Sequence, residues 1–255
     1  MKPQQYQQLA ETEDSHWWHR SRLTLAGRYI ARMKLGPHAR ILDVGCGTGG
    51  TTRFLQHHGA VVGIDRSPLS LAHARRKARE ASLVQADANR LGALFAPASF
   101  DLITFFNVLY HQWMTDDQAI INGAARLLRP GGHLLLTEPA FAAMMRHHDR
   151  LDMGKRRYRL SDFRRFFETA GLGYRSGQYF NALAVPACLA LALRDRLWSR
   201  PAEGEGDDES GPAGEMAVPA APLNEAVHRY MGIESRVLGA LSIPVGVTLI
   251  AVARK

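Results

Sequence analysis

Short apolar runs alternate with amphipathic segments along the chain from about residue 40 onward. The runs at 40–44, 61–65, 83–86, 101–106 and 133–137 predict strands, and a last run at 247–252 predicts one more. Helical spacing of apolar residues predicts helices at 51–58, 68–79 and 116–128, with Ser67 and Thr115 as N-caps. A later helix is expected to start at Ser161. This alternation of strands and helices predicts an α/β fold, with helices on both faces of a mostly parallel sheet.

The segments outside this pattern differ from it in composition. Residues 1–36 are polar and then helical, which predicts an N-terminal helical cap on a main domain spanning 37–255. Residues 201–222 hold six acidic residues and no Lys or Arg, with many Gly, Pro and Ala, a composition typical of disorder. Residues 182–197 are markedly apolar and are interrupted by Pro186. This segment fits a core helix, a lid, a dimer face or a peripheral membrane contact, and we favour the first two.

Composition narrows the class of protein. A chain of 255 residues with 46% hydrophobic content can bury a full core. No apolar run reaches 18 residues, and the N-terminus lacks the apolar stretch of a secretory signal, so a cytoplasmic protein is expected. Cys46 and Cys188 are expected to be reduced thiols. A net charge of +8 favours anionic partners without identifying them.

A glycine-rich motif follows the first predicted strand, where residues 40–50 read RILDVGCGTGG. Gly45, Gly47 and Gly49 allow a sharp turn and a close approach of the backbone to a ligand. Gly45, Gly47 and Gly50 also fit the dinucleotide-binding spacing, which is a weak signal when taken alone. Asp43 lies two residues before the first glycine and offers a carboxylate to a cationic group, whereas it would repel a phosphate.

Two more acids follow successive predicted strands, namely Asp65 after the second and Asp87 after the third. Carboxylates at three strand ends suit a ligand that carries an ammonium group, a ribose and an adenine amine. They suit a pyrophosphate badly, so the pattern favours such a ligand over a dinucleotide.

The motifs together resemble those of the class I S-adenosylmethionine-dependent methyltransferases. The resemblance rests on residues 43–49, 63–65, 86–88, 100–103 and 128–132, in the order and spacing of that family. It implies a Rossmann-like fold with a seven-stranded sheet and S-adenosylmethionine as cofactor. It implies cofactor-binding roles for Asp43, Gly45, Cys46, Gly47, Gly49, Asp65, Arg66, Asp87 and Ala88. Asn107, just past the fourth strand, either lines the site or only ends the strand.

Residues 13–22, EDSHWWHRSR, resemble a segment that precedes the core in one methyltransferase subgroup. This chain has His19 where that pattern has Phe, and Leu23 where it has Arg. Adjacent tryptophans are costly to expose, so they pack on the core or cover the cofactor. The resemblance implies that Trp18 and Arg20 contact the cofactor, with the arginine holding its carboxylate.

Acceptor-site insertions are expected at 140–160 and 181–244. Residues 146–165 hold eight Lys or Arg and three acids, and they resemble a segment of the same subgroup. Arg156, Arg157 and Tyr158 therefore are candidates for binding an anionic group of the acceptor. The alternative is a solvated basic face.

Methyl transfer depends mainly on alignment of the reactants, and a hydroxyl acceptor also needs a general base. The candidates for that base are His111, His147 and His148, and Tyr110 and His111 are further candidates for acceptor contacts. A carboxylate acceptor needs no base. Metal-ligand spacing is not evident, so no metal is expected.

Three functions compete at this point. The first is methyl transfer to a small-molecule or glycan-type acceptor, at oxygen and with an anionic group on the acceptor. The second is methylation of a macromolecule, such as a peptide terminus or RNA. Against RNA, the basic stretch is short and the sequence has no separate RNA-binding module, and DNA is not expected as a partner. The third is a non-catalytic cofactor-binding protein. The oligomeric state is left open.

Overall fold

The computed structural model describes residues 3–146, 149, 153–198, 218–241 and 244–255. His147 and His148, two of the predicted bases, lie outside the described residues, as does most of the acidic stretch predicted to be disordered.

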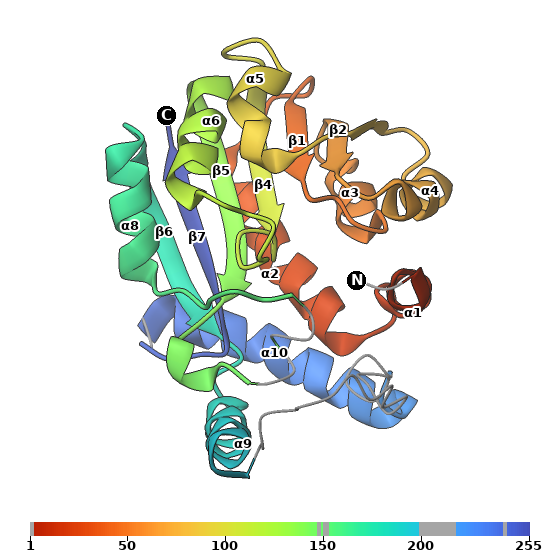
Figure 1. Ribbon diagram of the computed structural model, residues 1–255, viewed down its shortest axis with the longest axis vertical. Coiled ribbons are helices and arrows are strands. Elements are labelled where there is room, and N and C mark those ends of the chain that lie inside the picture. Colours follow the sequence, from red (N-terminus) through yellow and green to blue (C-terminus); the bar gives the residue numbers. More distant parts are fainter. Residues whose placement is uncertain (1–2, 147–148, 150–152, 199–217, 242–243) are drawn as a thin grey trace.

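A seven-stranded sheet forms the centre of the described chain (Figure 1). The strands are β1 (Arg40–Val44), β2 (Ala60–Asp65), β3 (Ser82–Gln85), β4 (Phe100–Phe106), β5 (Leu128–Pro139), β6 (Gly173–Phe180) and β7 (Thr248–Arg254). Their order is β3-β2-β1-β4-β5-β7-β6. Only β7 runs antiparallel to its neighbours, with Leu135 opposite Val252 in the pairing with β5. The Rossmann-like, mostly parallel sheet that the sequence predicts is confirmed.

Helices cover both faces of the sheet. On one face, α2 (Trp17–Met33), α3 (Gly50–Leu55) and α10 (Ala221–Leu241) enclose a core that includes Leu25, Ile41 and Met231. On the other, α5 (Leu91–Leu94), α6 (Asp117–Leu127) and α8 (Leu160–Thr169) enclose a core rich in phenylalanine. The helices α1 (Pro3–Thr12) and α4 (Pro68–Lys77) contact each other at one end of the sheet.

The structure confirms one of the predicted helix starts and differs from the other two. Ser67 caps α4, since its hydroxyl accepts a hydrogen bond from the Ser70 N–H, as expected. Thr115 does not cap α6: the carboxylate of Asp116 accepts from the Ala119 N–H, a stronger charge-assisted bond at a helix N-terminus. Ser161 lies inside α8, which begins at Leu160. The strand β6 was not expected, because its first residues alternate weakly and remain partly exposed at the sheet edge.

The apolar segment 182–197 is neither a core helix nor a lid over the cavity described below. Most of it forms α9 (Val185–Trp198), with Pro186 in its first turn, where proline is tolerated. Leu193 is 55% exposed and Leu197 is 64% exposed. The prediction was wrong because the apolar residues of this helix do not gather on one side of it, and it packs mainly against the short 3-10 turn Ala142–Met144.

Candidate active site

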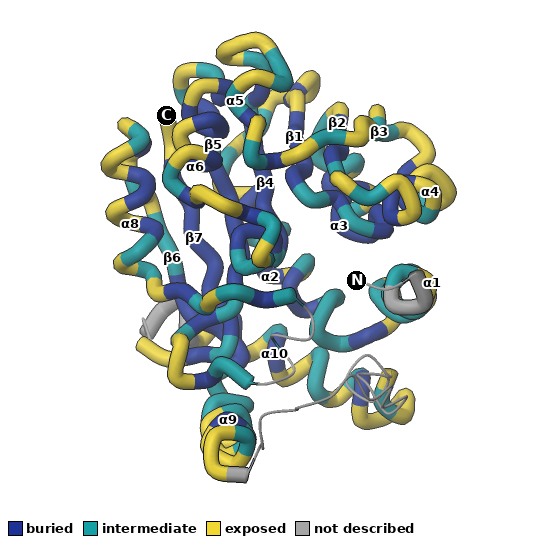
Figure 2. The backbone as a smooth tube through the Cα atoms, viewed as in Figure 1, coloured by how far each residue is buried: buried dark blue, intermediate teal, exposed yellow. Residues whose placement is uncertain are grey.

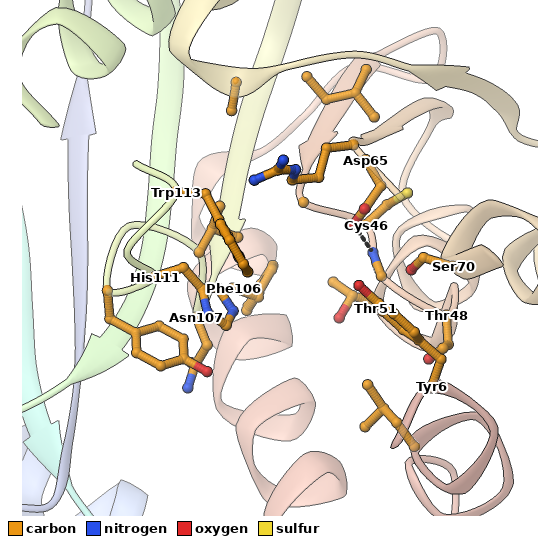
Figure 3. Close-up of a pocket in the computed structure, with 18 of the residues that line it drawn as sticks. Tyr6, Cys46, Thr48, Thr51, Asp65, Ser70, Phe106, Asn107, His111 and Trp113 are labelled. Atoms are coloured by element: carbon orange, nitrogen blue, oxygen red, sulfur yellow. Dashed lines mark hydrogen bonds between the residues drawn. The ribbon is translucent and has the colours of Figure 1, made fainter. Parts of the chain in front are cut away.

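A cavity of about 340 Å³ opens at the carboxyl ends of β1, β2 and β4, the edge at which doubly wound sheets bind ligands. Figure 3 shows its two walls. Asp65, Cys46, Thr48 and Tyr6 lie on one side, and Trp113, His111 and Asn107 lie on the other. The cavity is large enough for a small-molecule ligand.

The glycine loop forms part of the cavity wall that carries Asp65, Cys46 and Thr48. Gly45 and Gly47 have φ angles of +69° and +55°, which glycine adopts at little cost. A Cβ on Gly45 would lie 2.5 Å from a methyl carbon of Val108, so this position has no room for a side chain. Cys46, also in the loop, lines the cavity, and burial raises the pKa of its thiol well above the usual range. Cys46 therefore fills space as a neutral thiol.

Asp65 joins the end of β2 to this loop. Its Oδ2 accepts from the Gly47 N–H at 3.0 Å, and its Oδ1 accepts from the Ser67 N–H at 2.8 Å. Burial raises the pKa of Asp65, and the two backbone hydrogen bonds oppose that rise. The carboxylate is thus fixed in the cavity wall, where it can accept from hydroxyl groups of a ligand.

Asp43 and Gly49, for which the resemblance implies cofactor contacts, do not line the cavity that the described residues form. Asp43 is buried behind the loop, and its carboxylate accepts from the hydroxyls of Thr52 and Thr104 at 2.7 and 2.9 Å. Burial raises the pKa of Asp43 to about 6. Gly49 has φ +96° and packs against α4, where a Cβ would lie 2.7 Å from the Cα of Ala74. Both residues shape the loop from behind.

The loops after β3 and β4 close one end of the cavity. Asp87 caps a short 3-10 turn by accepting from the Asn89 N–H, and Ala88 is buried beside it. The Asn89 side chain donates to the Trp113 carbonyl at 2.8 Å. The guanidinium of Arg66 lies 4.6 Å from the centre of the Trp113 ring. Arg66, Asp87, Ala88 and Trp113 all line the cavity, and the side chains of Arg66 and Trp113 stack on each other.

Arg22, on α2, presents the cation that was predicted for Arg20. Arg22 is only 7% exposed and lines the cavity, and its Nε finds no hydrogen-bond partner among the described residues. Its guanidinium lies 4.8 Å from the Trp18 ring and 5.5 Å from the Phe106 ring. Burial lowers the pKa of Arg22 to about 10, so the group stays charged at neutral pH.

Arg20 lies on another side of α2, away from this cavity. Its Nη1 donates to Glu225 of α10 at 2.9 Å, across a partly exposed ion pair. Arg20 does not line the cavity, because a helix advances about 100° per residue, so positions 18 and 22 share a face while position 20 does not. Trp18, which was also predicted, does line the cavity.

The N-terminal residues cover the glycine loop. Tyr6 and Leu9 line the cavity, and the Glu13 carboxylate accepts from Thr48 Oγ1 and from Lys77 Nζ, each at 2.7 Å. His19 lines the same space, and burial, with help from the charge of Arg22, lowers its pKa well below 6.5. The sequence did not predict the contacts of Tyr6, Leu9, Glu13 and His19. It could have predicted Arg22, because Arg22 lies one helical turn after Trp18.

Residues 106–111 form the rest of the wall to which Trp113 belongs (Figure 3). Asn107 has φ +59° and lines the cavity, with its Oδ1 accepting from Thr137 Oγ1. Tyr110 and His111 also line it, with their rings 4.1 Å apart. The buried Glu138 carboxylate fixes this loop by accepting from the N–H groups of residues 108, 109 and 110.

Arg156, Arg157 and Tyr158 do not reach the cavity as the described residues define it. Arg156 and Lys155 pair with Asp117, which is 1% exposed, and the Tyr158 hydroxyl donates to the same carboxylate at 2.5 Å. Arg157 Nη2 donates to both carboxylate oxygens of Asp149, at 2.9 Å to Oδ1 and 3.0 Å to Oδ2. In the structure, acids of the fold already pair with these cations.

Comparisons with known proteins bear on this site. Residues 41–132 match the family described as a methyltransferase domain. A malonyl-[acyl-carrier protein] O-methyltransferase of Enterobacter lignolyticus is 38% identical over 44% of this chain and 43% of its own length. A ubiquinone biosynthesis O-methyltransferase of Xanthomonas campestris is 40% identical over 43% of this chain and 46% of its own length. The matches thus span less than half of each of these relatives.

An S-adenosylmethionine-dependent methyltransferase structure from Mesorhizobium loti covers 91% of this chain and 98% of its own, with a TM-score of 0.56 and 18% identity. The fold is that of the class I methyltransferases. Together with the matched domain, it implies S-adenosylmethionine as the cofactor, and the cavity fits that molecule. Asp65 faces the space from the end of β2, Arg22 offers a buried cation, and Gly45 and Gly47 leave the loop open to close approach.

Proposed function

We propose that this chain transfers a methyl group from S-adenosylmethionine to an oxygen atom of a small-molecule acceptor. The observation that carries the proposal is that Arg22 and Asp65 both line the same cavity. The Arg22 guanidinium is buried, and its Nε has no hydrogen-bond partner among the described residues, so it suits a carboxylate of the ligand. The Asp65 carboxylate is fixed in the same cavity and suits ribose hydroxyls.

Each end of the cavity has a role in this proposal. Arg22 binds the carboxylate of the cofactor, Asp65 accepts from its ribose hydroxyls, and Glu13 lies where it can face the ammonium group. The adenine ring lies beside Ala88 and Asp87, at the part of the cavity that Arg66 and Trp113 also line. Gly45 and Gly47 let the loop backbone approach the ligand closely.

S-adenosylmethionine supplies a methyl group that its sulfonium charge already activates for displacement. The chain aligns the acceptor oxygen with the methyl group and keeps water out of the cavity. Trp18, Phe106 and Tyr110 exclude water, because their aromatic side chains line the cavity. A hydroxyl acceptor loses its proton as its oxygen takes the methyl group. His111 accepts that proton, because it is the predicted base that lines the cavity in the described chain.

Two relatives are named as O-methyltransferases, which supports oxygen as the acceptor atom. The structure offers no second cation for an anionic acceptor from the 155–157 segment, so a neutral hydroxyl compound is favoured over a glycan acid or a phosphate.

The test is release of S-adenosylhomocysteine by the full chain over a panel of phenols, hydroxy acids, di- and tricarboxylates, sugars and peptides. We expect turnover with a small hydroxyl compound and a kcat at least about tenfold lower in His111→Gln. The matched control is His57→Gln, an exposed histidine at the end of α3. Turnover of peptides alone would contradict a small-molecule acceptor. Cofactor binding without turnover of any acceptor would favour a non-catalytic role.

A further inference from the structure

Glu138 is a buried acid to which the proposed methyl transfer gives no role of its own. It lies next to the last residue of β5, is fully buried, and does not line the cavity that the described residues form. Figure 2 shows β4 and β5 buried along most of their length in this part of the sheet. Burial raises the pKa of Glu138, and the backbone N–H groups of residues 108–110 and the charge of Arg22 oppose that rise. A buried acid is costly to keep, so the contacts that hold it indicate its use.

The two oxygens of Glu138 divide three N–H groups between them. Oε1 accepts from Val108 at 3.0 Å and from Leu109 at 2.8 Å. Oε2 accepts from Tyr110 at 3.2 Å. The ionised form suits all three donors, because both of its oxygens accept and neither carries a hydrogen. An amide in its place would present a donor to one of these N–H groups.

The carbonyl groups of the same loop also have partners. Those of residues 108, 109 and 110 accept from the His111 N–H, the Tyr158 hydroxyl and the Lys155 N–H, in that order. Each backbone N–H and carbonyl of residues 108–110 is therefore hydrogen-bonded. A different conformation of this loop would break several of these bonds at once, so the loop is held in one conformation.

This loop carries side chains of the cavity wall. Asn107, Tyr110 and His111 line the cavity, and Figure 3 shows Asn107 and His111 in the same wall. Val108 packs against the glycine loop, where a Cβ on Gly45 would lie 2.5 Å from its methyl carbon. Methyl transfer depends on the alignment of the reactants, so a small shift of this wall should slow it.

We infer that Glu138 is a positioning residue for methyl transfer, which acts through the loop 107–111 by fixing the places of Tyr110 and His111 in the cavity wall. It contacts neither cofactor nor acceptor itself, since it lies behind the lining of the cavity. The inference rests on the proposed function, because it gives the loop a part in turnover. A residue with only a structural role would change stability and leave the turnover of the folded protein unchanged.

Glu234 on α10 offers a matched control. It is 5% exposed and accepts from the N–H groups of residues 181 and 182, at a corner that follows β6. Asn181 begins that corner with φ +62°, as Asn107 begins the other with φ +59°. Neither Glu234 nor its corner lines the cavity that the described residues form. The same change at Glu234 therefore shows what weakening such a corner does at a distance from the cavity.

The test compares Glu138→Gln with Glu234→Gln by hydrogen–deuterium exchange of the free protein, by titration with S-adenosylmethionine, and by kcat with an acceptor that the wild type methylates. In Glu138→Gln the amide oxygen can still accept from residues 108 and 109, whereas the NH2 group faces the Tyr110 N–H. We expect faster exchange at Tyr110, a Kd for S-adenosylmethionine near the wild-type value, and a kcat lower by about tenfold or more. Glu234→Gln should keep the wild-type exchange at Tyr110 and the wild-type kcat.

Glu138→Asp keeps both oxygens on a shorter side chain, and its exchange and kcat should lie between those of the wild type and Glu138→Gln. It replaces Glu138→Gln in the test if the glutamine variant does not fold. Unchanged exchange at Tyr110 would overturn the inference, as would a kcat that falls equally in both glutamine variants. Faster exchange with a wild-type kcat would overturn it and leave the proposed function standing. If the wild type methylates no acceptor, the proposed function fails first, and Glu138 only holds a loop.

Discussion

Two groups of basic residues lie near the carboxyl edge of the sheet, and they differ in what neutralises them. In the segment 155–157, Lys155 and Arg156 share Asp117, and Arg157 holds Asp149 with two contacts. In the cavity wall, Arg22 is buried against two aromatic rings, and its Nε has no partner in the described chain. Both groups are positive, but only Arg22 is left available for an anionic ligand.

The difference shows that local charge in the sequence does not identify a binding residue. A buried unpaired cation is costly, and folds rarely keep one without a use. A paired cation instead holds the chain in place, as the Asp117 contacts hold the segment 155–158 against α6. The following predictions separate these two roles by stability and by ligand affinity.

The largest effect is expected at Asp117. Asp117→Ala removes the carboxylate shared by Lys155, Arg156 and Tyr158, and should lower the free energy of unfolding by about 3 kcal/mol. Urea denaturation of the wild type and the variant measures this. Arg157→Ala should also destabilise the protein while leaving the acceptor KM unchanged. A raised KM with unchanged stability would restore the acceptor role to this segment.

Arg22→Ala should weaken S-adenosylmethionine binding by about 2 kcal/mol, or roughly thirtyfold in Kd, through loss of a charge-assisted hydrogen bond. Arg22→Lys should recover only part, because lysine lacks the planar fork. The matched control is Arg20→Ala, which removes a partly exposed ion pair and should change the Kd little. Calorimetry that ranks the two alanine variants the other way would return the role to Arg20.

The smallest effect concerns pH and His19. Since burial holds the folded-state pKa of His19 well below 6.5, the unfolded chain binds the proton first as the pH falls. This group therefore costs stability below about pH 6.5, the ordinary histidine value, and costs none above it. His19→Phe should flatten the fall in melting temperature between neutral and acidic pH. Identical pH profiles for the two proteins would show that His19 is accessible to solvent.

The sheet could be predicted from the sequence, and so could the cavity-lining residues that lie at or just after the ends of strands. Asp65 is the last residue of β2, Ala88 lies three residues after β3 and Asn107 directly follows β4, so the parallel sheet brings them to the same edge. Asp43 also lies near the end of its strand, yet it is buried and bonded to Thr52 and Thr104, and no periodicity reveals such partners. The resemblance of residues 13–22 to a methyltransferase subgroup remains a prediction.

Residues from distant segments were harder to place. The choice between Arg20 and Arg22 depends on the rotation of α2 over the sheet, which α10 fixes from more than 200 residues away. The exposure of α9 could not be predicted, because the apolar residues of this segment do not gather on one side of the helix.

The most direct test of the account compares two ligands on two proteins by calorimetric titration. S-adenosylmethionine carries the carboxylate that Arg22 is proposed to bind, whereas 5′-methylthioadenosine lacks it and keeps the adenine and ribose. The account predicts that Arg22→Ala weakens the first ligand roughly thirtyfold and leaves the Kd of the second near its wild-type value. An equal loss for both ligands, or none for either, would contradict it.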